Sequence, residues 1–164
     1  MRILGIDPGY AIVGVGVIDY NNVNFEPVYF TSITTPAKTD FPLRLQMIYN
    51  SILQIIDNFQ PEAMAIEKLY YNTNSKTVID VAEARGVILL AARNKNIPIY
   101  EYTPLQVKSA VTGYGKAEKH QVMELTRQLL RLKEVPKPDD TADALAIAIC
   151  HAHSYNSFKY NLGR

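Results

Sequence analysis

The sequence has a single cysteine, no long apolar run and almost no net charge, and each shortage excludes a class of protein. Cys150 alone cannot form an internal disulfide framework, and one cysteine is typical of a protein kept in a reducing cytoplasm. No stretch approaches the ~18 consecutive apolar residues of a membrane-spanning helix. The start, MRILGIDPG, has too short an apolar run for a signal peptide. We therefore expect a cytoplasmic protein with no membrane segment.

The net charge of +1 provides no bulk electrostatic argument for a nucleic-acid partner. The charges are unevenly spread, because the segment from Lys95 to Lys137 holds eight Lys or Arg against four Asp or Glu. Such an excess can attract phosphate, although charged runs on helices are more often solvated faces. Apolar residues make up 48% of the 164 residues, which is typical of one globular domain. We expect that domain over 1–155 and a flexible tail over 156–164.

The first part of the chain predicts three strands, over residues 2–7, 13–19 and 25–34. Short turns join them, so they indicate an antiparallel meander. Gly14 and Gly16 lie on one face of the second strand, which leaves space for the close approach of another backbone or a ligand. Pro27 predicts an edge position or a bulge in the third strand.

The rest of the chain alternates helical and strand patterns. We expect helices over 41–59, 75–94, 103–113, 117–132 and 140–153, and strands over 63–67 and 97–102. Thr103 is a good N-cap before a first-turn proline, and Gly113 lies where that helix should stop. The order βββ-α-β-α-β-α-α-α indicates the α/β class, with a five-stranded mixed sheet and helices on both faces.

Four acidic residues stand out by their positions at the ends of predicted elements. Asp7 ends the first strand and Glu67 the fourth, and ligands gather outside the carboxyl ends of parallel strands. Asp140 and Asp143 lie three apart on one face of the last helix, beside Asp139, the more natural N-cap. Four convergent carboxylates would repel one another without divalent cations, and oxygen-only ligands favour Mg²⁺ or Mn²⁺. A pair of such ions supports phosphodiester hydrolysis.

Each acid taken singly also has an ordinary structural explanation. Asp7 can cap the turn that follows it, and the acids of the last helix suit a helix N-terminus. Glu67 can pair with Lys68 or Lys76 on the surface. The metal-site hypothesis therefore depends on the four carboxylates meeting in space, which a structure can test.

Three motifs together resemble the RuvC family of Holliday-junction resolvases. They are IDPG followed by GVGVI, then AIEKLYYNTNSKTVIDVAEARG, then DDTADALAIAICHAH, in order from Met1 to about His153. The resemblance implies a ribonuclease H-like fold and a homodimer that makes symmetric paired nicks in a four-way DNA junction, in homologous recombination and DNA repair. It also implies a hydrolysis that leaves a 5′-phosphate and a 3′-hydroxyl, and it suggests association with a RuvA–RuvB branch-migration complex.

The resemblance also assigns roles to individual residues. The family's catalytic and metal-binding positions fall on four acids, Asp7, Glu67, Asp140 and Asp143. They would hold two Mg²⁺ ions per active site, with Mn²⁺ as a substitute. Some relatives carry histidine where Asp140 stands. For the homodimer, the helix over 75–94 is our candidate interface, because apolar residues and a glycine cover much of it: Val78, Ile79, Ala82, Gly86 and Leu90.

Four further residues are expected to contact DNA: Tyr70, Lys108, Lys116 and Lys119. Tyr70 matches a family aromatic that stacks near the junction centre, while Tyr71 beside it is an alternative, and a core or interface role stays open. Lys108 and Lys119 match basic positions near the active site, or are ordinary solvated helix residues. Lys116 lies in a glycine-containing segment that resembles a mobile DNA-contacting loop.

Other functions stay open from the residues alone. A nuclease of the same fold that acts on single-stranded DNA or RNA is separated only by the resemblance. A non-catalytic junction-binding module is disfavoured, because a surface that only binds DNA should avoid clustered negative charge. An actin-like nucleotide-binding protein would need a second half and a second phosphate loop, for which 164 residues leave no room.

Overall fold

Five strands form one mixed sheet: β1 (Arg2–Asp7), β2 (Ile12–Tyr20), β3 (Phe25–Thr34), β4 (Ala63–Glu67) and β5 (Ile99–Tyr102). The computed structural model describes residues 1–69 and 77–161, and side chains as far as Tyr155. The strand order is β3-β2-β1-β4-β5, with β1, β2 and β3 antiparallel and β1, β4 and β5 parallel. The predicted meander and mixed sheet are both confirmed.

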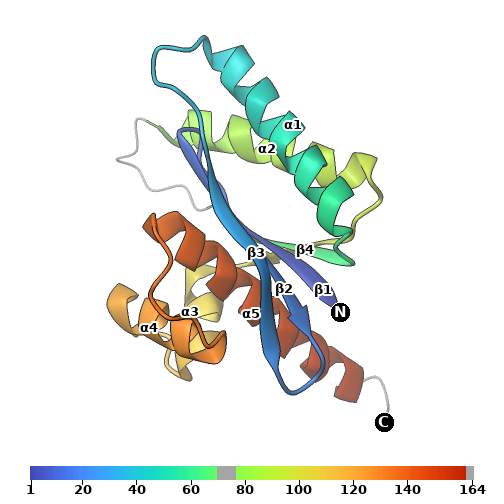
Figure 1. The fold of residues 1–164 in the computed structure, drawn as a ribbon, viewed down its shortest axis with the longest axis vertical. Helices are drawn as coiled ribbons and strands as arrows, with labels where there is room; N and C mark the ends of the chain where they lie inside the picture. The colour runs from blue at the N-terminus through green and yellow to red at the C-terminus, as the bar shows by residue number, and fades with distance from the viewer. Residues whose placement is uncertain (70–76, 162–164) are drawn as a thin grey trace.

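Helices cover both faces of this sheet, as the element order predicted (Figure 1). One face carries α1 (Phe41–Phe59) and α2 (Val78–Asn94). The other carries α5 (Asp139–Asn161), with α3 (Pro104–Thr112) and α4 (Lys119–Leu129) packed beside it. None of the described helices is long and apolar enough to cross a membrane.

Residues of β1 alternate between the two faces of the sheet, so this strand contributes to two hydrophobic cores. Leu4 and Ile6 are fully buried in the core under α1 and α2. Ile3 is buried on the opposite side, in the core beneath α5. By the same alternation, Asp7 at the end of the strand faces the side that α5 covers.

Glycines in β1 and β2 let α5 lie directly on the sheet. An added Cβ at Gly14 would stand 1.9 Å from the backbone oxygen of Asp140, and one at Gly5 would stand 2.1 Å from that of Ala144. A Cβ at Gly16 would stand 2.8 Å from a side-chain carbon of Leu145. The close backbone approach that Gly14 and Gly16 predicted is therefore confirmed, and the approaching backbone is that of α5.

The edge of the sheet and the caps of α3 also agree with their predictions. β3 is an edge strand, and the register of its pairing with β2 shifts opposite Pro27. Thr103 Oγ1 accepts a hydrogen bond of 3.1 Å from the Gln106 backbone N–H, while the Gln106 side chain accepts one from the Thr103 N–H at 2.9 Å. Gly113 ends the helix with a left-handed φ of 74°.

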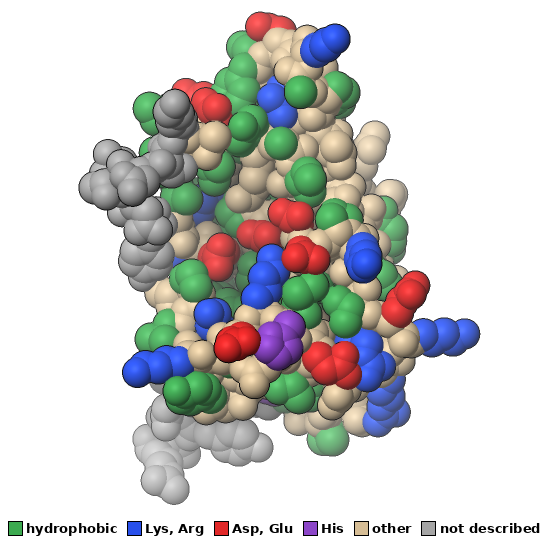
Figure 2. All heavy atoms as spheres, turned by 90° about the vertical axis from the view of Figure 1, so that its left-hand side faces the viewer, with side chains coloured by type: hydrophobic (Ala, Val, Ile, Leu, Met, Phe, Trp, Pro, Cys, Tyr) green, Lys and Arg blue, Asp and Glu red, His purple; other side chains and the backbone are tan. Residues whose placement is uncertain are grey.

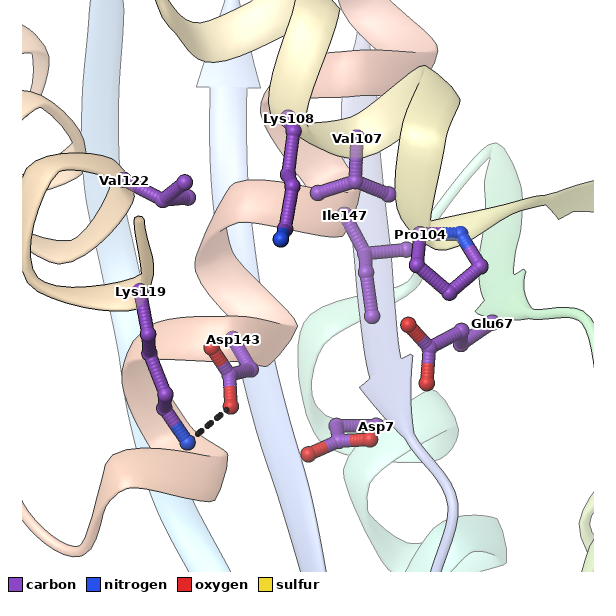
Figure 3. Close-up of a pocket in the computed structure, with 9 residues that line it drawn as sticks. All are labelled: Asp7, Glu67, Pro104, Val107, Lys108, Lys119, Val122, Asp143 and Ile147. Atoms are coloured by element: carbon purple, nitrogen blue, oxygen red, sulfur yellow. Dashed lines mark ion pairs between the residues drawn. The ribbon is translucent and has the colours of Figure 1, made fainter. Parts of the chain in front are cut away.

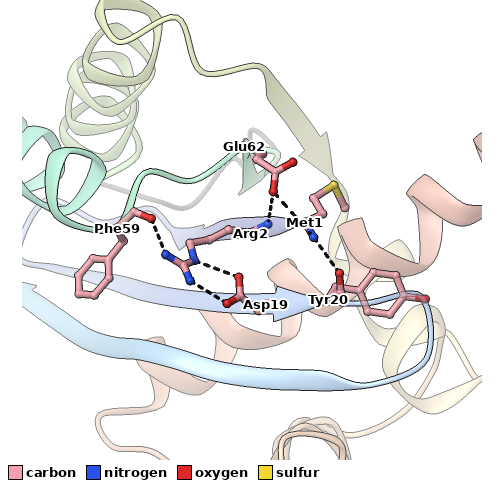
Figure 4. Close-up of polar contacts among 6 residues, drawn as sticks. All are labelled: Met1, Arg2, Asp19, Tyr20, Phe59 and Glu62. Atoms are coloured by element: carbon pink, nitrogen blue, oxygen red, sulfur yellow. Dashed lines mark hydrogen bonds and ion pairs between the residues drawn. The ribbon is translucent and has the colours of Figure 1, made fainter.

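Polar contacts hold the amino-terminal end of β1 (Figure 4). The Arg2 guanidinium donates two hydrogen bonds to the Asp19 carboxylate, at 2.9 and 2.8 Å, and one of 3.0 Å to the Phe59 carbonyl. The Met1 ammonium donates to the Tyr20 carbonyl at 2.9 Å. These bonds join β1 to β2 and to the end of α1, at the end of the sheet opposite Asp7.

The last helix differs from its prediction at both ends. It begins at Asp139, so Asp139 lies in its first turn and the expectation that this residue is the N-cap is wrong. The chain enters the helix from Pro138, whose carbonyl accepts a hydrogen bond of 3.0 Å from the Thr141 N–H. The helix continues to Asn161, past the predicted end at 153, because no Gly or Pro interrupts residues 154–161.

The close contact between α5 and the sheet predicts the effect of filling one glycine. Gly5→Ala should lower the free energy of unfolding by about 3 kcal/mol, because the new methyl overlaps backbone that cannot rotate away. Asn50→Ala in α1 is the control, since this side chain is exposed within the helix, and it should raise stability by roughly 0.5 kcal/mol because alanine favours a helix more than asparagine does. Urea unfolding followed by circular dichroism measures both. Equal stability of Gly5→Ala and the wild type would contradict the packing.

Candidate active site

Two of the predicted acids lie side by side at one edge of the sheet. β1 and β4 are parallel neighbours, and Ile6 is in register with Ile66. The next residues, Asp7 and Glu67, are therefore adjacent at the carboxyl ends of the two strands. The shared edge that the sequence predicted for this pair is confirmed.

The first turns of α5 bring the other two acids to the same edge. Gly14 is the pairing partner of Asp7 across β1 and β2, and the backbone of Asp140 lies directly on Gly14. Asp143 follows one helical turn later. Figure 3 shows the carboxylates of Asp7, Glu67 and Asp143 facing a common space.

This space is a pocket of about 280 Å³ between the sheet edge and the helices α3, α4 and α5. Its lining comprises three carboxylates, two lysines and four apolar residues: Asp7, Glu67, Asp143, Lys108, Lys119, Pro104, Val107, Val122 and Ile147. Figure 2 shows one face of the molecule, with acidic side chains gathered at its centre and basic side chains next to them. The arrangement is a partly apolar cavity with concentrated negative charge.

The carboxylates oppose one another's ionisation. Burial raises the pKa of Asp7 to about 8, and the charges of Glu67, Asp143 and Asp140 add to the rise. Burial, then the charge of Asp143, also raises the pKa of Glu67. The pKa of Asp143 is raised by burial in spite of its contact with Lys119. Clustered carboxylates with raised pKa values are typical of functional sites. Their burial and repulsion destabilise the fold, so stability does not explain why they lie together.

Among the residues that the structure describes, Lys119 is the cation in contact with the acidic cluster. Its Nζ lies 3.0 Å from Asp143 Oδ2 and 3.4 Å from Asp139 Oδ2. Burial lowers the pKa of Lys119, but its contacts with the two carboxylates outweigh burial, so the pKa is raised and the ammonium stays charged. Lys108 reaches the pocket from α3, where Figure 3 shows its amine pointing inward.

The remaining predicted residues lie elsewhere. Asp140 does not line the pocket, although its charge raises the pKa values of Asp7 and Asp143. Lys116 is exposed between α3 and α4 and does not line the pocket either. Tyr70 and its alternative Tyr71 lie outside the described residues.

The structural explanations for Asp7 and Glu67 find no support in the described part of the chain. No hydrogen bond to the Asp7 carboxylate occurs there, as an Asx-turn would require. Glu67 forms no ion pair with Lys68, and Lys76 lies outside the described residues. Asp139 and Asp140 do occupy the first turn of α5, where acidic side chains interact favourably with the helix dipole.

The donors of the pocket suit a hard divalent cation in their chemistry, because every candidate ligand is a carboxylate oxygen. A cation would also favour the ionised form of Asp7, against the burial and the repulsion that raise its pKa. Within the described ranges, however, no three His, Cys, Asp or Glu side chains already stand close enough to hold one ion.

The apolar residues that line the pocket were not predicted from the sequence. Pro104, Val107, Val122 and Ile147 come from three different helices and form its apolar wall. Val122 carried a signal only as part of an apolar helical stripe. Arg85 was also missed: its Nε donates a hydrogen bond of 3.2 Å to the Glu67 carbonyl. In the sequence, Arg85 was noted only as part of the motif that ends in AEARG, without a role of its own.

The raised pKa of Asp7 predicts how stability depends on pH in solutions free of divalent cations. The folded protein holds the Asp7 proton up to about pH 8, whereas an unfolded chain releases it near 3.8. Stability from this group is therefore full at pH 4 and is lost as the pH rises toward 8. Asp7→Asn cannot ionise, so it should exceed the wild type by about 2–4 kcal/mol at pH 8 and by little at pH 4.

Denaturant unfolding of both proteins in EDTA, across that pH range, measures the difference. Parallel pH profiles for the two proteins would show that Asp7 ionises freely in the fold, and would contradict the prediction.

Comparisons with known proteins show the family to which this chain is similar. The family model for crossover junction endodeoxyribonuclease RuvC matches residues 3–151. The RuvC of Caldanaerobacter subterraneus subsp. tengcongensis is 56% identical over 156 residues, covering 95% of this chain and 94% of the relative. The RuvC of Brevibacillus brevis is 57% identical over 152 residues, covering 93% and 92%.

Solved structures show the same fold. The Thermus thermophilus RuvC structure superposes with a TM-score of 0.88 at 34% identity and covers 96% of both chains. The yeast mitochondrial Holliday junction resolvase superposes with a TM-score of 0.66 at 14% identity and covers 98% of this chain and 86% of that one, which supports the fold alone. The expected ribonuclease H-like fold is confirmed by these resolvase neighbours. With nearly the whole chain matched and more than half of its residues shared with curated relatives, the protein belongs to the RuvC family of crossover junction endodeoxyribonucleases.

Proposed function

We propose that this nuclease cuts four-way DNA junctions in the pocket of Asp7, Glu67 and Asp143, with Asp140 beside it. The observation that carries the proposal is the meeting of carboxylates from β1, β4 and α5 in one cavity. A Thermus thermophilus RuvC, 32% identical over 96% of both chains, has been solved in complex with a Holliday junction substrate. That relative supports the junction as the substrate here.

The pocket suits direct hydrolysis of a phosphodiester. None of its lining residues, in the part of the chain that the structure describes, is Ser, Thr, Cys, Tyr or His, so no side chain there is an obvious covalent nucleophile. Water then attacks phosphorus, the bond to the 3′ oxygen breaks, and the products carry a 5′-phosphate and a 3′-hydroxyl. When bound, a pair of Mg²⁺ ions supplies activation of that water and stabilisation of the leaving oxygen.

The position of each side chain in the pocket indicates its proposed role in this reaction. Asp7 and Glu67 belong to paired strands, and Asp143 to a helix packed on glycine, so all three carboxylates are positioned by rigid elements as metal ligands. Lys119 neutralises Asp143, and Lys108 offers a second positive charge to the phosphate. The apolar wall of the pocket limits the water around the reacting group.

A homodimer would explain the surface of α2. Its buried side consists of Ala84, Ile88, Ala91 and Ala92. Of the apolar positions predicted for the interface, Val78 is half-buried and the other four are exposed: Ile79, Ala82, Gly86 and Leu90. Ile79 is 67% exposed and Leu90 is 52% exposed, with Gly86 open between them. We propose that this outward face pairs with its copy in a second chain, since two-fold symmetry would place two active sites on a junction that is itself two-fold.

Several expectations stay predictions from the family resemblance. They are base stacking by Tyr70, DNA contact by Lys116, association with a RuvA–RuvB complex, the cytoplasmic location and the flexible tail over 156–164. A nuclease of this fold that prefers single-stranded DNA or RNA is the alternative function, and the substrate panel below separates it.

The proposed function is tested with a labelled four-way junction, a matched linear duplex and a single strand. The wild type should make symmetric paired nicks in the junction only, with Mg²⁺ and not with EDTA. Asp7→Asn should bind the junction but lose cleavage by about 10³-fold or more, because it lacks a charged ligand. Equal cutting of all three substrates would contradict junction selectivity, and cleavage by Asp7→Asn would contradict the role of Asp7.

The dimer proposal predicts that a charge on the outward face of α2 separates the chains. Leu90→Glu should sediment as a monomer, because dimerisation would bury an unpaired carboxylate. Val23→Glu is the matched control, since Val23 is 79% exposed in the turn between β2 and β3 and should leave the dimer intact. Sedimentation velocity distinguishes the species, and a dimeric Leu90→Glu would place the interface elsewhere.

A further inference from the structure

Arg85 joins α2 to the two strands at the edge of the active-site pocket. Its Nε donates a hydrogen bond of 3.2 Å to the backbone carbonyl oxygen of Glu67, the last residue of β4. Its Nη2 forms an ion pair with the carboxylate of Glu101 in β5. The Arg85 side chain is only 14% exposed, whereas that of Glu101 is 47% exposed, so the contact with the Glu67 carbonyl is the more buried of the two.

The backbone at Glu67 lies where the pairing of β4 comes to an end. On the β1 side the register stops at Ile66, one residue earlier. On the β5 side it stops at Glu67, opposite Tyr102, and the Lys68 N–H then donates to the Tyr102 carbonyl at 2.8 Å. At the residue whose carboxylate enters the pocket, the strand is thus paired on one side only. The hydrogen bond from Arg85 supplies an additional restraint there.

We propose that Arg85 is a positioning residue for Glu67: oriented by Glu101, it fixes the backbone at the end of β4 and with it the direction of the Glu67 carboxylate. This inference rests on the proposed role of Glu67 in the reaction. A planar guanidinium can donate to a carbonyl and a carboxylate at once in fixed directions, which a lysine ammonium cannot do with the same geometry. Because the Arg85 charge is paired with Glu101, its effect on Glu67 passes through the backbone.

The position of Arg85 keeps this role separate from dimerisation. Arg85 points toward the sheet, whereas the apolar residues proposed for the interface point outward from the same helix. A second ion pair provides a matched control: Lys95 follows the end of α2, and its Nζ lies 2.6 Å from the carboxylate of Asp57 in α1. That pair also ties α2 to a neighbour but touches no residue of the pocket.

The test compares Arg85→Ala, Arg85→Lys, Glu101→Gln and Lys95→Ala with the wild type and with Glu67→Gln. Three quantities are measured on a labelled four-way junction: the single-turnover cleavage rate with enzyme in excess, the Mg²⁺ concentration for half-maximal rate, and the junction dissociation constant in EDTA. Sedimentation and thermal unfolding report assembly and folding.

Arg85→Ala should slow cleavage by about 10- to 100-fold, the usual cost of misplacing a reacting group by roughly 1 Å. It should also raise the Mg²⁺ requirement while leaving junction binding and dimer size unchanged. Arg85→Lys should recover part of the rate, and Glu101→Gln should show a smaller loss in the same direction. The double variant Arg85→Ala/Glu101→Gln should match Arg85→Ala alone, because the two residues act as one unit. Lys95→Ala should cleave like the wild type.

Different failures point to different errors. Wild-type cleavage and Mg²⁺ dependence in Arg85→Ala, with Glu67→Gln inactive, would overturn the positioning role and leave the proposed function standing. A rate loss that only follows lost junction binding or lost folding, and that Lys95→Ala shares, would also overturn it. Normal cleavage by Glu67→Gln would instead overturn the proposed role of Glu67. Should Arg85→Ala fail to fold, Arg85→Lys and Glu101→Gln decide the question by the same measurements.

Discussion

The contact between the first turns of α5 and the glycines of β1 and β2 is the constraint on which the site depends. A side chain at Gly14 would meet the Asp140 backbone, and one at Gly5 would meet the Ala144 backbone. Without that closeness, the helix would stand away from the sheet and its carboxylates would not reach Asp7. The same contact excludes water beneath α5, where the helix residues from Ala144 to Cys150 are fully buried. The packing of α5 and the assembly of the acidic pocket therefore share one requirement, the absence of side chains at Gly5 and Gly14.

Bringing the carboxylates together has an electrostatic cost that the fold offsets only in part. Asp7 is buried among other acids, and Lys119 is the cation that contacts the cluster directly. A structure selected for stability alone would not retain such an arrangement. The negative charge does suit the binding of divalent cations. Such cations would also offset the repulsion between these acids and an approaching DNA phosphate. At the end of β4, Arg85 donates a hydrogen bond to the Glu67 carbonyl, as its proposed positioning role requires.

Local features of the sequence predicted much of the fold. Pro27 indicated an edge strand, Thr103 and Gly113 indicated the limits of α3, and both predictions are confirmed because each depends on the geometry of a few neighbouring residues. The shared edge of Asp7 and Glu67 was expected from their places at the carboxyl ends of two strands, and the parallel pairing of β1 with β4 confirms it. The end of α5 was not predicted in the same way. The absence of Gly and Pro over residues 154–161 permits the helix to continue, but it does not by itself distinguish a continued helix from a loose end.

By itself, the sequence determined the class of fold, the family and the acids at the ends of the elements. Periodicity, caps and glycines are short-range properties, and the order of the motifs is read directly along the chain. Only the tertiary structure decided which residues surround those acids. It placed Lys119 against Asp143, left Asp140 beside the pocket and Lys116 outside it, and put Arg85 on the Glu67 carbonyl. These contacts join segments that lie far apart along the chain, and the spacing between such segments carries no record of the distance at which they pack.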